Sequence, residues 1–351
     1  MSTLVVRTGS ISMYFKSIFQ GNLHFGNAKT YDKVVKMYEH RLENYYKMDV
    51  AFDLAEIFNT ETFSLQIPRF VGNLSDKTWK NTVDLLNYVS QFAIAGNVGA
   101  WMTEEGKILR YSWIEPVGDK AAVQTFLKGR QLIEKEGKEK EAEKALTKAI
   151  EIYNKHAQAY ERRGYVNYLL KKYHDADRDF TKSINLDKSN APAYHGRARI
   201  KMLREDWEAA IDDLAMAIKT SLALQDIHWI ARRLKADCHM KLQQWPEAEF
   251  ELKFFTRRKF KKDSPNHSWQ RMAQFNYGKV LLEQEKFLKA LEAFEKVLGM
   301  TEGADNISEA EKLLFRGIAR KHAGKHGYLS DWSEASKLGS TQAVELLDAA
   351  K

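Results

Sequence analysis

The stretch "ERRGYVNYLLKKYHDADRDFTKSI", residues 161–184, does not fit a single amphipathic helix. Gly164 lies in its first turn, and two lysines interrupt the apolar spacing near its middle. Small residues nevertheless recur at definite places among bulky ones, and Gly164, Ala176 and Ser183 are the clearest of them. This pattern predicts two shorter antiparallel helices that pack most closely where the small residues meet.

The pattern returns when the sequence is compared with itself at a shift of 34 residues, and three windows then abut without a gap. Looser copies begin at Trp229, Arg271 and near Ala310. Residues at positions 8 and 20 are expected to lie at the helix crossing, where a larger side chain would force the helices apart. Positions 4, 8, 17, 20, 24 and 27 of the window that starts at Val123 are Phe126, Arg130, Glu139, Ala142, Leu146 and Ala149. In the window that starts at Ala157 they are Tyr160, Gly164, Tyr173, Ala176, Phe180 and Ser183. In the window that starts at Ala191 they are Tyr194, Ala198, Trp207, Ala210, Leu214 and Ala217.

Two windows depart from the pattern. Arg130 stands at the small position 8 of the first window, and Arg232 stands at the bulky position 4 of the fourth. After the last window, the segment "STQAVELLDAA" predicts a short helix. Such a terminal helix is expected to cap the array, because the end of a helical solenoid must cover its apolar surface.

The signature resembles the tetratricopeptide repeat (TPR), with a similarity to Sel1-like repeats at the C-terminal end. The resemblance implies a mostly α fold over residues 119–351, a right-handed TPR-like α-solenoid of about six helix pairs with a C-terminal capping helix. The expected repeats lie near 123–156, 157–190, 191–224, 229–262, 271–304 and 310–339, with the cap at 340–351.

Residues 1–118 do not show the repeat pattern, and their mixture of helix and strand signals predicts a small α+β domain of no recognised family. Amphipathic spacing predicts helices over 30–47 and 75–92, with Ser75 as the N-cap of the second. Strands are expected in "TLVVRT" (3–8) and "TFSLQI" (62–67), and in two segments that flank a turn at Glu105-Gly106. Residues 116–119 are the expected link to the repeats.

Composition narrows the class of protein. The 351 residues carry a net charge of +8, and because residues 1–120 contain 13 basic and 13 acidic residues, the whole excess falls in the repeats. No apolar run approaches the length of a membrane span, and no signal peptide is evident. With Cys238 as the single cysteine, these points favour a cytoplasmic protein.

No catalytic, cofactor or metal motif stands out. The "GNVG" at 96–99 lacks the full glycine fingerprint of a phosphate loop, and a strand bulge or turn explains it better. The ten histidines are scattered without the spacing of a zinc site. We therefore expect no enzyme activity, no cofactor and no metal.

The strongest charge cluster lies at 253–271, where aromatic residues alternate with basic ones. It could hold nucleic acid through phosphate contacts and stacking, or it could dock an acidic protein segment. It could also be a solvated helix end whose aromatic side chains pack inside. Its basic residues are Lys253, Arg257, Arg258, Lys259, Lys261, Lys262 and Arg271, and its aromatic residues are Phe254, Phe255, Phe260 and Trp269.

The TPR resemblance implies a second candidate surface, because the first helix of each repeat lines the concave face in that family. This lining is basic with amide and aromatic neighbours and suits an extended peptide that carries carboxylates. The alternative is that any solvated helix face is charged. The candidates are Lys128, Gln131, Lys135, Arg162, Tyr165, His195, Arg199, Arg233 and Asp237.

The resulting prediction is a non-enzymatic adaptor or scaffold that binds an acidic or extended peptide segment of a protein partner, away from membranes. A different class remains open: residues 1–118 could be a small-ligand sensor or enzyme module whose targets the repeats recruit. A polar pocket with converging titratable side chains in that domain would favour this alternative. A third possibility is an RNA-binding repeat protein, which a steep salt dependence would reveal.

Overall fold

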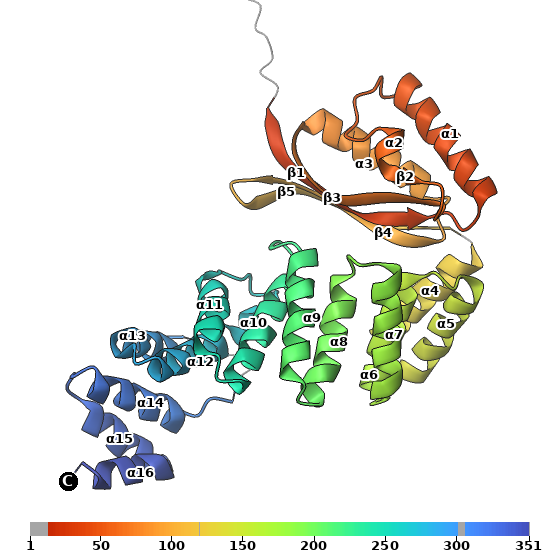
Figure 1. Cartoon of the computed structure of the whole chain (residues 1–351). Helices are drawn as coiled ribbons and strands as arrows, with labels where there is room; N and C mark the ends of the chain where they lie inside the picture. The colour runs from red at the N-terminus through yellow and green to blue at the C-terminus, as the bar shows by residue number, and fades with distance from the viewer. Residues whose placement is uncertain (1–12, 119, 301–305, 351) are drawn as a thin grey trace, which may run out of the picture. The chain divides into compact units, whose positions relative to one another are not determined.

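The structure is a computed structural model that describes residues 13–118, 120–300 and 306–350 (Figure 1). The chain divides into two compact units, Met1–Ser189 and Asn190–Lys351. Within the described ranges, no helix combines the length and the apolarity that crossing a membrane requires. The expected strand at 3–8 lies outside the described residues.

The first unit opens with an antiparallel sheet in the strand order β2-β3-β1-β4-β5. Three helices, α1 (Ala28–Asn44), the short α2 (Leu54–Ile57) and α3 (Asp76–Ser90), lie on one face of this sheet (Figure 1). Apolar side chains from both layers, such as Phe19, Leu65, Val34 and Leu86, form one buried core. The strands are β1 (Tyr14–His24), β2 (Phe58–Asn59), β3 (Ser64–Ser75), β4 (Ala95–Glu104) and β5 (Lys107–Ile114).

The structure confirms both helices expected in this domain, and the Ser75 hydroxyl caps the second by accepting a hydrogen bond from the Thr78 N–H at 3.0 Å. The hairpin is also confirmed, with Glu105 and Gly106 in the left-handed region at φ of 49° and 78°. Two details differ. The strand expected at 62–67 continues to Ser75, and β1 was not predicted.

Over residues 120–300 and 306–350, the helices form six antiparallel pairs and a terminal helix, as predicted. The pairs in the first unit are α4 (Ala121–Ile133) with α5 (Glu139–Ile152) and α6 (Ala157–Leu169) with α7 (Tyr173–Leu186). Pro192 and Pro246 each lie in the first turn of a helix, where the missing N–H costs no hydrogen bond. The second unit holds α8 (Ala191–Leu203) with α9 (Trp207–Thr220), α10 (Asp226–Lys241) with α11 (Trp245–Arg257), α12 (Gln270–Glu283) with α13 (Phe287–Leu298), α14 (Glu309–His322) with α15 (Tyr328–Lys337), and the capping helix α16 (Thr341–Asp348).

Small residues lie at the helix crossings, as the repeat pattern requires. Ala176, Ala198, Ala210 and Ala290 are fully buried. A Cβ added at Gly278 would lie 2.6 Å from the Phe294 ring, so these two helices could not approach as closely with a larger residue there.

The first repeat corrects one expectation, because Gly129 and not Arg130 occupies the crossing. A Cβ at Gly129 would lie 2.6 Å from the Leu146 side chain. The turn between α4 and α5 spans residues 134–138 and is longer than the three-residue turns of the next repeats, which displaces α4 by one position. Arg130 instead makes hydrogen bonds of 2.7 and 2.9 Å to the Glu115 carboxylate.

This ion pair belongs to a set of contacts that join the α+β domain to the first two repeats within the first unit. The Lys120 ammonium donates to the carbonyl oxygens of Gln91 and Ala93, each at 3.1 Å. The Asn22 amide donates to the Asp187 carboxylate at 3.2 Å. The two parts therefore share a polar interface.

Candidate functional site

Successive first helices of the second unit bring polar side chains together in what we call the α8–α12 cluster. It consists of His195 and Arg199 on α8, Arg233 and Asp237 on α10, and Asn276 on α12. The members on one helix are four residues apart, so they lie one above the other on the same face. Four of the five were predicted as groove residues from the sequence.

Arg233 is the most confined member of the cluster. Its side chain is 12% exposed, and its guanidinium lies 4.1 Å from the centroid of the Trp269 ring. One Nη atom is 3.5 Å from the Asp237 carboxylate, whereas the Nε has no hydrogen-bond partner among the described residues. Burial lowers the pKa of Arg233, and the nearby Arg199 lowers it further. Arg233 is thus a confined cation with an unused donor.

The other titratable members respond to the same environment. Burial raises the pKa of Asp237 to about 6, although Arg233 opposes this shift. The Asp237 side chain is nevertheless 32% exposed. Burial, Arg199 and Arg233 together lower the pKa of His195 to about 4, so this imidazole is neutral at pH 7. The cluster therefore holds two arginines and one carboxylate, with Arg199 acting on His195 and Arg233, and it is rich in positive charge.

The comparisons with known proteins bear on the helical part of the chain. No family model and no curated protein matches the sequence. Among solved structures, YrrB, described as a TPR protein with an unusual peptide-binding site, is 19% identical, with 59% of this chain and 98% of that chain covered at a TM-score of 0.50. PilF of Pseudomonas aeruginosa is 18% identical, with 66% of this chain and 98% of that chain covered at a TM-score of 0.50. The helix pairs form a TPR fold.

Several predicted groove residues of the TPR helices lie elsewhere or are already paired. Lys128, Gln131 and Lys135 are exposed, and Gly129 next to them packs against Leu146 of α5. In the second repeat, Tyr165 is half-buried, and the Arg162 Nε lies 3.2 Å from the carboxylate of the buried Glu161. Arg162 is therefore partly neutralised within its own helix.

In the basic cluster at 253–271, three of the four named aromatic side chains pack against the protein, whereas Phe254 is exposed. Phe255 is fully buried and Phe260 packs against it at 5.0 Å between ring centroids, while Trp269 supports Arg233. Arg271 is 5% exposed, so it cannot reach a ligand on the surface. The other basic side chains are exposed around the end of α11 and the loop that follows it: Lys253, Arg257, Arg258, Lys259, Lys261 and Lys262.

Sequence reasoning missed two neighbours of Arg233 and Asp237. Asn276, whose amide lies 3.5 Å from the Asp237 carboxylate, occupies position 6 of the fifth window, and extending the lining rule to that repeat would have found it. Trp269 was named only as an aromatic residue of the basic cluster, and because it lies between two windows, the repeat pattern does not place it beside Arg233.

The motifs set aside on sequence grounds have structural roles. "GNVG" is part of β4, and a Cβ at Gly96 would lie 2.2 Å from the carbonyl oxygen of Asn22 on the adjacent strand. Burial raises the pKa of Cys238 to about 12, so it remains a thiol at neutral pH. The described residues contain no group of three or more His, Cys, Asp or Glu side chains arranged to hold a metal ion.

Proposed function

We propose that the chain is a non-enzymatic adaptor whose α8–α12 cluster binds an acidic segment of a partner protein in an extended or singly helical form. The observation that carries the proposal is Arg233, which is confined next to a second arginine and has a buried Nε with no partner in the part of the chain that the structure describes. A carboxylate from a ligand would supply the missing acceptor and relieve the repulsion between Arg199 and Arg233.

The composition of the cluster sets the expected specificity. The planar guanidinium of an arginine can pair a carboxylate through two parallel hydrogen bonds, which favours Asp or Glu over neutral residues. The negative charge of Asp237 repels an anion beside it, so an anion that does not pair with both arginines gains little by binding. YrrB, a TPR protein with an unusual peptide-binding site, supports peptide recognition on the same fold.

The proposal can be tested without knowing the natural partner. Selection of a displayed library of random short peptides on the full-length protein should enrich sequences with Asp or Glu. The selected peptide is then titrated by calorimetry against the wild type and the Arg199→Gln, Arg233→Gln double variant. The double change should weaken binding by about 2–4 kcal/mol if both arginines pair desolvated carboxylates.

A matched control makes the same charge change on the other basic surface. Arg257→Gln with Arg258→Gln removes two exposed arginines and should leave the affinity for the selected peptide close to that of the wild type. If the Arg199, Arg233 double variant binds the peptide as tightly as the wild type, the α8–α12 cluster is excluded as the binding site. A loss confined to the Arg257, Arg258 variant would instead locate the binding surface in the basic cluster.

A further inference from the structure

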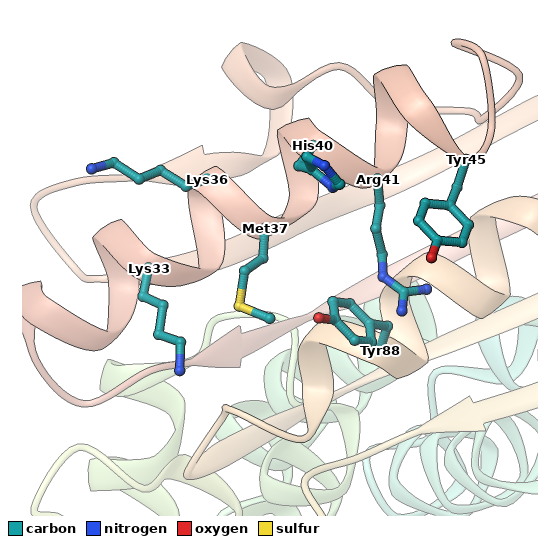
Figure 2. A pocket seen from close by; sticks show the side chains of 7 residues that line it. All are labelled: Lys33, Lys36, Met37, His40, Arg41, Tyr45 and Tyr88. Atoms are coloured by element: carbon teal, nitrogen blue, oxygen red, sulfur yellow. The ribbon is translucent and has the colours of Figure 1, made fainter.

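The α+β domain has a hollow of about 350 Å³ between α1 and α3. The sequence of α1 builds most of it, because residues at spacings of three and four lie on one face of a helix. Figure 2 shows Lys33, Lys36, Met37, His40 and Arg41 along that face of α1, with Tyr45 at its end and Tyr88 of α3 on the other side.

The side chains that line the hollow are rich in cations and contain no acid among the residues described there. Lys33, Lys36 and His40 are exposed, so their nitrogen atoms are accessible to a ligand from solvent. The nearest acid of α3, Asp84, accepts a hydrogen bond of 2.5 Å from the Tyr46 hydroxyl. An anion in the hollow would therefore meet several donors and no direct carboxylate competitor.

The hollow also has flat and apolar surfaces. The Arg41 guanidinium lies 3.4 Å from the centroid of the Tyr88 ring and 4.9 Å from that of Tyr45, so the two tyrosines fix its plane. Met37 points into the hollow beside Tyr88, and its polarizable thioether makes favourable contacts with aromatic rings (Figure 2). A flat ring of a ligand can lie against Met37 and the part of the Tyr88 ring that Arg41 does not cover.

We propose that this hollow binds a mononucleotide, with the phosphate held by the Lys33, Lys36 and His40 side chains and the base against the Met37–Tyr88 surface. The volume lies at the lower end of the range for small-molecule sites, which suits one nucleotide better than a larger cofactor. A site of this kind makes the α+β domain a ligand-sensing module joined to the TPR fold, which goes beyond the peptide-binding role proposed above.

The test titrates the full-length protein with AMP, adenosine and inorganic phosphate by calorimetry. AMP should bind at least about tenfold more tightly than either fragment, because only AMP uses both the cationic and the flat surfaces. The proposal is overturned if AMP does not bind at millimolar concentration. Phosphate that binds as tightly as AMP, or adenosine that does so, also overturns it.

Variants assign the two surfaces separately. Lys33→Gln with Lys36→Gln changes exposed side chains that the fold does not need, and it should weaken AMP at least about tenfold while leaving adenosine unchanged. Met37→Gln should weaken both AMP and adenosine. Lys16→Gln, an exposed lysine that does not line the hollow, is the matched control and should have no effect. Equal AMP affinity in the wild type and the double lysine variant contradicts the proposed site.

Discussion

The Arg197 guanidinium holds the Asp213 carboxylate with two hydrogen bonds, 2.8 Å from Nε and 2.7 Å from Nη2, and only 4% of the Asp213 side chain is exposed. Arg163 and Asp179 repeat this geometry one repeat earlier, with the same two distances. Each pair joins the two helices of one repeat. The buried carboxylate is therefore part of the repeat architecture, even though the repeat pattern of small and bulky residues did not predict it.

Removing the arginine of one such pair should destabilise the fold. In Arg197→Met, the buried Asp213 loses its bidentate partner and keeps Lys201, 2.8 Å away, as a cationic partner. We expect a loss of about 2–3 kcal/mol in the free energy of unfolding by urea. Lys138→Met, which breaks an exposed pair with Glu141, should cost less than about 1 kcal/mol. Similar losses in both variants would contradict a special role for the buried pair.

The helix crossings provide a second test of the repeat register. Ala210 is fully buried, and Ala210→Leu should overpack its crossing and cost about 1–3 kcal/mol of unfolding free energy. The control is Ala209→Leu, which places the same side chain at a half-buried position of the same helix and should cost less. Thermal melts of the two variants in parallel would show the difference, and an unchanged melting temperature for Ala210→Leu would contradict the register.

The same packing explains how much of the fold could be predicted. Ala176, Ala198 and Ala210 recur at fixed spacing because helix contact selects small residues, and this signal is local in sequence. Gly129 was missed because the extra length of one turn shifted α4, and a fixed-period comparison cannot register such a shift. Strand β1, "YFKSIFQGNLH", was missed because it owes its place to pairing with β3 and β4, which are far away in sequence.

The helix face that carries the candidate site could be predicted from the sequence, but the contacts of its side chains could not. His195, Arg199, Arg233 and Asp237 were placed by the lining rule of the resembled family. That rule gives the face of a helix, but it does not give the pairing of a side chain. The neutralisation of Arg162 by Glu161 and the stacking of Arg233 on Trp269 depend on three-dimensional contacts. The hollow in the α+β domain needs α3 beside α1, which no local pattern specifies.

The turns inside the repeats store a small amount of backbone strain. Lys171 and Glu205 have φ of 59°, and Gln243 and Glu285 have φ of 56°, at the same point of four successive repeats. This left-handed conformation is unfavourable for residues with a Cβ. Glu285→Gly should therefore raise the unfolding free energy by about 0.5–1 kcal/mol, as measured by urea denaturation.

The control for the turn places glycine inside a helix. Glu292 is exposed in the interior of α13, where Glu292→Gly should lower the unfolding free energy by about 0.5–1 kcal/mol. If Glu285→Gly raises the unfolding free energy and Glu292→Gly lowers it, the effect at Glu285 comes from relief of backbone strain. A loss of stability in both variants would show that the Glu285 side chain contributes more than the strain costs.

The link between the α+β domain and the repeats predicts the behaviour of fragments. We expect residues 119–351 to fold alone as a helical protein, since the helix pairs have their own buried cores. The fragment should nevertheless melt below the full chain, because it lacks Glu115 as the partner of Arg130 and the carbonyl partners of Lys120. Circular dichroism tests this prediction, and an unfolded fragment would make the α+β domain an integral cap.

The pH dependence of peptide binding should report on Asp237, whose pKa of about 6 lies above the ordinary value for aspartate. Below pH 6 the carboxyl is neutral, so the cluster loses its negative charge and keeps both arginines. The acidic peptide, whose own carboxylates remain ionised, should therefore bind more tightly at about pH 5.5 than at about pH 7.5, by about two- to tenfold. His195 does not titrate in this range, because its pKa of about 4 leaves it neutral throughout.

Stability should change in the same window, and the direction follows from proton binding. Between the ordinary aspartate pKa and about 6, the folded state holds a proton that the unfolded state has released, so the stability conferred at low pH is lost as pH rises through 6.

Asp237→Asn carries no titrating group at this site. It should bind the acidic peptide with nearly the same affinity at both pH values, whereas His195→Gln should retain the pH dependence of the wild type. Calorimetry of the three proteins at the two pH values separates these outcomes, and a persistent pH effect in Asp237→Asn would assign the titration to another group.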